Sequence, residues 1–110
     1  MKDSTPLRPI DKTQLLREVE LVEKILTLSG STSTLDAAAD LSLELMKTQK
    51  TNTFSSIDVN EHVYYRFDLR RKLEASDEAG AKDSQINIDV SLEEIRQDLE
   101  RAKAILKDGE

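Results

Sequence analysis

The sequence predicts an all-α fold, a small up-down-up-down bundle of four helices. Apolar residues recur every three or four positions over four stretches, roughly 11–29, 34–49, 58–75 and 91–108, and this is the period of an amphipathic helix. Most connections are short enough to make consecutive helices antiparallel neighbours. A chain of 110 residues allows one domain, and without cysteine its stability must come from packing rather than from disulfides. The alternative fold is a helical hairpin that a partner protein or a second copy completes.

Residues 1–10 are predicted to form an extended arm ahead of a single helical domain, residues 11–110. Pro6 and Pro9 disfavour a helix within the arm. Asp11 is a suitable N-cap for the first helix, and a glycine follows the end of that helix. The apolar arc of this helix is unusually wide for a surface helix, so we expect it to contact more than one neighbour.

The second helix, residues 34–49, carries a row of acidic side chains. Ser33 and Asp36 have the spacing of a capping box at its start. Asp36, Asp40 and Glu44 repeat every four residues and share the face opposite the apolar one. Such a row is most often a solvated face, and the alternative is an acidic docking strip.

The third helix, residues 58–75, has two arginines in the middle of its apolar face. At about 100° per residue, Arg66 and Arg70 fall near the centre of this arc, whose other members are Val59, Val63, Tyr65, Phe67, Leu69 and Leu73. A charge in such a position needs a partner inside the fold or on another molecule. Glu18, the matching charge on the first helix, predicts an internal ion pair with Arg66. One carboxylate cannot readily serve both arginines, so we expect Arg70, next to Arg71, to reach outward.

These features predict a surface that binds a partner protein, because arginine and aromatic side chains often carry the binding energy of an interface. The residues expected to form it are Val63, Tyr65, Arg66, Phe67, Arg70 and Arg71. A homo-oligomer through residues 91–108, or through the helices at 11–29 and 58–75, is the other form of this prediction. The basic and aromatic run 64–72 leaves a nucleic-acid-associated factor as the competing function, although a net charge of −6 opposes polyphosphate binding.

The last helix is predicted at residues 91–108, after a flexible connector at 76–90. Ser91 with Glu94 has the spacing of a capping box, and the apolar residues that follow make a coiled-coil-like seam. Within the connector, residues 86–90 alternate between apolar and polar side chains. This alternation predicts either a brief strand or an extended lead-in that packs on the bundle.

The sequence offers little catalytic chemistry. It has no glycine-rich phosphate loop, no nucleophile elbow and no calcium-loop motif, and its single histidine makes a histidine-based metal site improbable. We therefore expect a non-catalytic subunit, adaptor or regulator with no metal, cofactor or membrane partner. With no signal peptide and no membrane span, a soluble cytoplasmic protein is the expectation, with the nucleus as the alternative.

Overall fold

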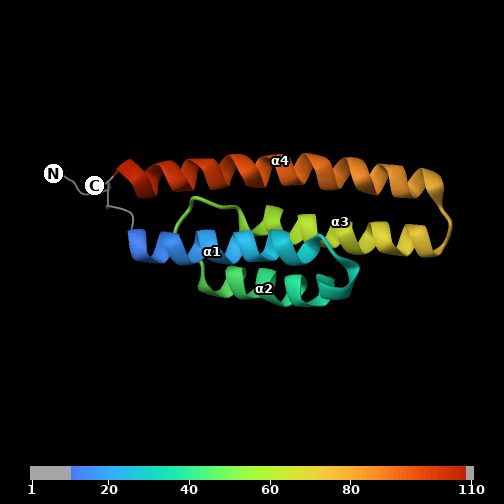
Figure 1. The fold of residues 1–110 in the computed structure, drawn as a ribbon, viewed down its shortest axis with the longest axis horizontal. Coiled ribbons are helices and arrows are strands. Elements are labelled where there is room, and N and C mark those ends of the chain that lie inside the picture. The colour runs from blue at the N-terminus through green and yellow to red at the C-terminus, as the bar shows by residue number, and fades with distance from the viewer. Residues whose placement is uncertain (1–10, 109–110) are drawn as a thin grey trace.

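Four α-helices alternate in direction along one long axis in the computed structural model, which describes residues 11–108 (Figure 1). The elements are α1 (Lys12–Ser29), the short 3-10 helix η1 (Thr32–Thr34), α2 (Leu35–Thr48), α3 (Ser56–Glu74) and α4 (Glu78–Asp108). No strand occurs within these residues. The prediction of an all-α, up-down-up-down bundle is therefore confirmed, whereas the arm predicted at residues 1–10 lies outside the described residues.

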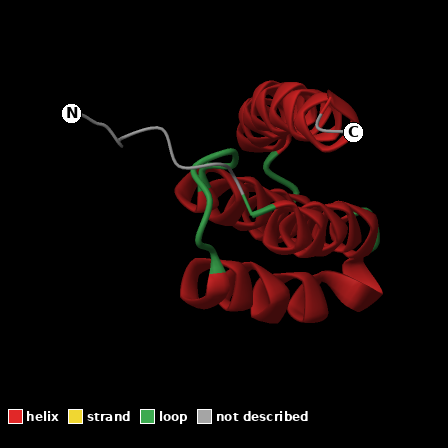
Figure 2. Cartoon of the chain, turned by 90° about the vertical axis from the view of Figure 1, so that its left-hand side faces the viewer, coloured by secondary structure: helices red, strands yellow, loops and turns green. Residues whose placement is uncertain are grey.

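The helices form three tiers, with α1 and α3 lying between α2 and α4 (Figures 1 and 2). The middle tier is staggered, because α3 is displaced along the long axis relative to α1. The C-terminal end of α3 consequently extends past the ends of α1 and α2, with α4 beside it (Figure 1). This overhang leaves a step at the place where α2 begins.

The hydrophobic core lies where the tiers overlap. The wide apolar arc of α1 contacts α2, α3 and α4, as the sequence predicts. Asp11 is the N-cap of α1, and its carboxylate accepts a hydrogen bond of 3.2 Å from the Gln14 backbone N–H. The largest fully buried apolar side chains are Leu15, Val22, Ile25, Leu35, Leu45, Val59, Ile88 and Ile95. At the rim, Lys103 of α4 pairs with Glu23 of α1 at 2.7 Å.

The helix α4 begins 13 residues earlier than predicted, at Glu78 rather than at residue 91. The predicted connector at 76–90, the strand at 86–90 and the N-cap role of Ser91 are wrong, because these residues are helical almost throughout. Of the alternating apolar residues only one, Ile88, is buried; the other two, 58% and 56% exposed, lie on the far side of the helix. The buried positions of α4 follow spacings of three and four and are Ala81, Ser84, Ile88, Ser91, Ile95, Leu99 and Ala102. Because several members are small or polar, this stripe has little hydrophobic signal in the sequence.

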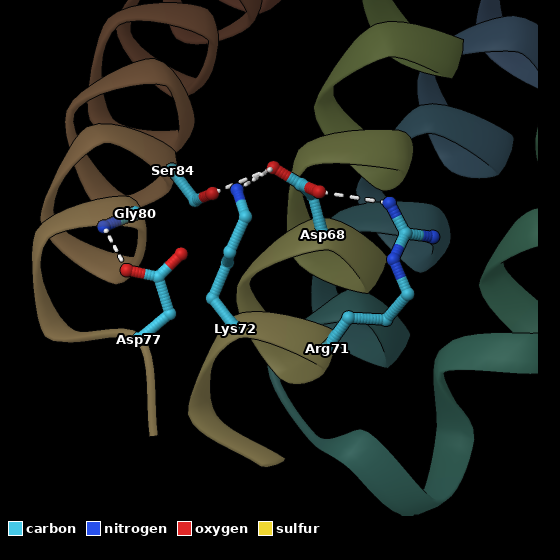
Figure 3. Close-up of polar contacts among 6 residues, drawn as sticks. All are labelled: Asp68, Arg71, Lys72, Asp77, Gly80 and Ser84. Carbon is cyan, nitrogen blue, oxygen red and sulfur yellow. Dashed lines mark hydrogen bonds and ion pairs between the residues drawn. The ribbon is translucent and has the colours of Figure 1, made fainter. Parts of the chain in front are cut away.

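A tight turn joins α3 to α4. Ser76 adopts the left-handed conformation at φ 57°, and its N–H donates to the Leu73 carbonyl at 3.1 Å. The Asp77 N–H donates to the Lys72 carbonyl at 2.8 Å, which completes a Schellman motif. The Asp77 carboxylate then accepts the Gly80 N–H at 2.9 Å and caps the start of α4 (Figure 3). Two helix ends are thus satisfied within a few residues, which leaves no room for a flexible connector.

Candidate interaction surface on α3

The two arginines singled out by the sequence line one small notch at the step in the fold. Arg66 and Arg70 are one helical turn apart and both are half-buried. The notch has a volume of about 190 Å³, and its other lining residues are Ser29, Gly30, Thr32, Leu35, Leu69 and Leu73. Arg66, Arg70 and Leu73 continue the core-facing stripe of α3 past the point where α1 and α2 end. The arginines therefore belong to the apolar face, as the helical wheel predicts, but they lie at its open edge.

Opposing electrostatic effects act on the two arginines of the notch. Ser29 and Gly30 mark the C-terminal end of α1, where the helix dipole places partial negative charge. Burial lowers the pKa of Arg66, and the nearby Asp89 carboxylate of α4 partly opposes that shift. The Arg70 guanidinium lies 5.0 Å from the centre of the Phe67 ring, within the range of a cation–π contact.

Neither arginine has an ion-pair partner among the carboxylates of residues 11–108. The Arg66 Nε atom is buried and has no hydrogen-bond acceptor. Unpaired charged donors at a half-buried site retain the capacity to bind an anionic group. The notch is thus suited chemically to a carboxylate that comes from elsewhere.

The predicted ion pair between Glu18 and Arg66 is wrong, because Glu18 is occupied by the loop that joins α2 to α3. Its buried carboxylate accepts hydrogen bonds from the Gln14 side chain at 2.7 Å and from the Lys50 backbone N–H at 2.8 Å. The Thr51 N–H at 3.3 Å and the Thr51 hydroxyl complete this set. Glu18 is a loop anchor, which explains a charge in an otherwise apolar arc.

The stagger of α3 explains why the pair does not form. Arg66 lies beside Ser29 at the C-terminal end of α1. Glu18 lies 11 residues before Ser29, which is about 16 Å along the helix axis at 1.5 Å per residue. A helical wheel gives the angular position of each charge but not its height along the axis.

The other predicted partner-binding residues divide between the core and another side of α3. Val63, at 3% exposure, is a core residue and not a partner-binding one, and Phe67 packs partly against the core. Tyr65 is half-buried, and its ring lies edge-on to the Tyr64 ring, with 6.1 Å between the ring centroids. Arg71 is exposed and lies away from the notch, 5.8 Å from the Tyr64 ring. Only Arg66 and Arg70 of the six predicted residues share the notch.

An acidic residue that sequence reasoning missed, Asp68, holds α3 to α4 (Figure 3). Its carboxylate accepts hydrogen bonds from Ser84 at 2.8 Å, from Arg71 at 2.8 Å and from Lys72 at 3.2 Å. The Ser84 hydrogen bond is the main cause that lowers the pKa of Asp68, with Lys72 next. Spacings of three and four residues to the two bases could have indicated this cluster. The cluster partly neutralises the basic run of α3.

The single histidine lies buried at the contact between α3 and α4. The His62 Nδ1 atom is 2.7 Å from the Ser91 hydroxyl, which donates to the Ile88 carbonyl at 3.0 Å. The His62 Nε2 atom has no partner. Burial, with a smaller effect of the Arg66 charge, lowers the pKa of His62 to about 4. The imidazole is therefore neutral at physiological pH.

A shallower groove of about 760 Å³ runs between α1 and α2. Its lining residues are Gln14, Arg17, Glu18, Glu20, Leu21, Lys24, Leu41, Glu44, Lys47, Thr48 and Lys50. Apart from Glu18, which anchors the loop, the charged residues of this groove are exposed to solvent. The groove is therefore lined mainly by solvated charged side chains.

The described part of the chain contains neither a cluster of metal ligands nor a helix that could cross a membrane. Within residues 11–108, no three histidine, aspartate or glutamate side chains gather closely enough to hold a metal ion. No helix among these residues combines the length and the hydropathy needed to cross a bilayer. Comparisons with protein-family models, with curated proteins and with solved structures find no match to this chain.

Proposed function

We propose that the chain is a non-catalytic protein–protein interaction module that acts as a subunit, adaptor or regulator in a larger complex. The observation that carries the proposal is the notch on α3, where Arg66 and Arg70 lie side by side without a carboxylate partner in residues 11–108. The ligand that fits this chemistry is a protein segment that presents carboxylates. A cytoplasmic setting remains part of the proposal.

The surroundings of the two arginines support a protein ligand. Leu73, at 62% exposure, and the partly buried Leu69 give the notch an apolar side. Arginine beside exposed apolar side chains is a combination typical of the residues that dominate protein interfaces. A volume of about 190 Å³ accommodates one or two side chains of a partner, whereas pockets for small molecules are usually about 300 to 1,000 Å³.

The state of the titratable groups supports a non-catalytic role. Asp68 has a lowered pKa because it bonds Ser84 and two bases, which is a structural arrangement. His62 has a strongly lowered pKa, but its side chain is fully buried and lines neither the notch nor the groove between α1 and α2. A catalytic acid or base must reach a substrate in a concave site.

Affinity purification with a matched control tests the proposal. The tagged chain is compared with an Arg66→Ala, Arg70→Ala double variant and with an Arg96→Ala, Arg101→Ala control on the exposed surface of α4. We expect the double variant to keep its helical circular dichroism and lose the bound partner, while the control keeps both. Hydrogen exchange of the purified complex should show protection over residues 66–73. Retention of the partner by the double variant would contradict the proposal.

A direct measurement of nucleic-acid binding separates a protein partner from a nucleic acid. The Asp68 cluster already engages Arg71 and Lys72, so only Arg66 and Arg70 of the basic run are unpaired within residues 11–108, and two half-buried bases make a weak phosphate-binding surface. We expect no saturable binding of mixed DNA and RNA at about 150 mM salt, a concentration that screens weak phosphate contacts. Saturable binding that Arg70→Glu and Arg71→Glu abolish would favour the nucleic-acid function instead.

A further inference from the structure

We infer that the ligand of the notch is a second copy of this chain, in a dimer with two-fold symmetry. In this dimer, Arg66 and Arg70 of one copy contact the acidic row of α2 on the other copy, formed by Asp36, Asp40 and Glu44. The inference rests on the proposed function and names its partner. Shape, charge and exposed apolar residues carry it independently of one another.

The shape of the molecule provides the first support. The tier formed by α2 is absent below the overhang of α3, because α2 begins at Leu35 beside the notch and runs away from it, while α3 continues to Glu74 (Figure 1). A second copy rotated by 180° about an axis at the step presents a step of its own to the first. The α2 helix of each copy can then lie beneath the overhanging α3 of the other, and both steps are filled at once.

Charge complementarity provides the second support. Asp36, Asp40 and Glu44 are all exposed, and no cation of residues 11–108 forms an ion pair with them. They are spaced by four residues, or about 6 Å along α2. The two arginines of the notch have the same spacing on α3. Two rows of opposite charge with one repeat can pair along neighbouring helices, and each arginine can bind a carboxylate through two N–H groups.

Exposed leucines provide the third support. Leu43 is 51% exposed and lies on the same outer face of α2 as Asp36 and Asp40. Leu73 is exposed at the edge of the notch. The dimer brings the two faces together, so an apolar contact would lie beside the ion pairs. This combination of apolar anchors and charged residues is the usual composition of an interface.

Self-complementarity explains why the partner is a copy rather than another protein. A two-fold interface requires both halves of each contact to lie on one chain. Asp36 directly follows Leu35, which lines the notch, so the basic and acidic halves are adjacent in the same molecule. A rotation about an axis close to Leu35 therefore forms both halves of the interface simultaneously.

Charge exchange tests the dimer and its symmetry together. The mass in solution is measured by light scattering and by sedimentation for the full chain, for Arg70→Glu and for Asp40→Arg. At about 100 μM protein and about 150 mM salt, we expect the unmodified chain to be a dimer. For each variant alone, the dissociation constant of the dimer should rise at least about tenfold. An equimolar mixture of the two variants should form a heterodimer. The glutamate introduced at position 70 of one chain then faces the arginine introduced at position 40 of the other, while the second contact keeps its original residues.

Controls make each outcome decisive. Arg96→Glu on the exposed face of α4 should leave the dimer unchanged, and circular dichroism should show equal helicity in every variant. A monomeric unmodified chain, variants that dimerise normally, or a mixture that stays monomeric would each overturn the inference. A monomeric chain whose partner capture still depends on Arg66 and Arg70 would overturn the dimer alone and leave the proposed function standing.

Discussion

Mild acid should destabilise the protein through its one histidine. Burial of His62 holds its pKa at about 4 in the folded state, against 6.5 for an unperturbed imidazole. The unfolded chain therefore binds a proton between these two values while the folded chain does not. The contribution of the neutral His62 to the stability of the folded state is fully present above about pH 6.5. It is lost as the pH falls toward 4.

The size of the effect follows from the two pKa values. Between about pH 7.5 and about pH 5, the His62 contribution to the free energy of unfolding should fall by about 2 kcal/mol. This loss is a large share of the roughly 5 to 15 kcal/mol that is typical of a small domain. At about pH 4 the loss should approach about 3 kcal/mol, because the folded imidazole then begins to protonate.

Urea denaturation of the unmodified chain and of His62→Gln at both pH values measures the effect. The carboxylates titrate in both proteins, so the difference between their pH dependences isolates the imidazole. Since the chain contains only one histidine, proton NMR of the imidazole also gives its native pKa directly. A native pKa at or above 6.5, the unperturbed value, or the same pH dependence in both proteins, would refute the reasoning.

Three further predictions concern single contacts. Glu18→Ala should cost about 2 to 5 kcal/mol in urea denaturation, because it leaves two loop N–H groups without their acceptor, while Glu20→Ala on the exposed side of α1 should cost almost nothing. Ser76→Gly should stabilise the protein by about 0.5 to 1 kcal/mol, measured as a higher melting temperature, because its left-handed backbone suits glycine. Ser84→Ala should raise the pKa of Asp68 toward its usual value in carboxylate NMR, and no change would show that this hydrogen bond does not set it.

The first three helices could be predicted from the sequence because their buried faces are apolar. The predicted ranges 11–29, 34–49 and 58–75 start and end within two residues of the bounds of α1, α2 and α3. Among the predicted caps, Asp11 does accept the hydrogen bond that the sequence predicts. The predicted capping box of Ser33 and Asp36 is wrong, because the N-cap of α2 is Thr34, which makes no side-chain cap. Periodicity and capping are local properties, and a single sequence contains them in full.

The first half of α4 could not be predicted in this way, because its contact with α3 is built from small and polar side chains. Ser84 and Ser91 are almost fully buried, yet they contribute nothing to a hydrophobic pattern. The alternation of residues 86–90 was conspicuous in the sequence, but two of its three apolar side chains face solvent. A polar interface can be recognised only when the opposing helix is known.

The candidate site could be predicted in part. The sequence identified Arg66 and Arg70 as charges on an apolar face, and the two do share one notch. It assigned the wrong partner to Arg66, because a helical wheel does not give the axial shift between α1 and α3, and Glu18 instead accepts hydrogen bonds from the loop before α3. Val63 is buried for a reason that the sequence does not contain. The extent to which α1 and α2 cover α3 decides which part of the apolar face of α3 belongs to the core.

The serine contacts between α3 and α4 have a consequence for the register of the two helices. The pairs Asp68–Ser84 and His62–Ser91 lie nearly two turns apart along the same seam. Sliding one helix by a single turn, about 5.4 Å, would break both pairs together and leave polar groups buried without partners. Apolar side chains would tolerate such a slip far better. Two small hydroxyls thereby fix the position of α3 along α4, and the stretch of α4 that lies beside the two arginines.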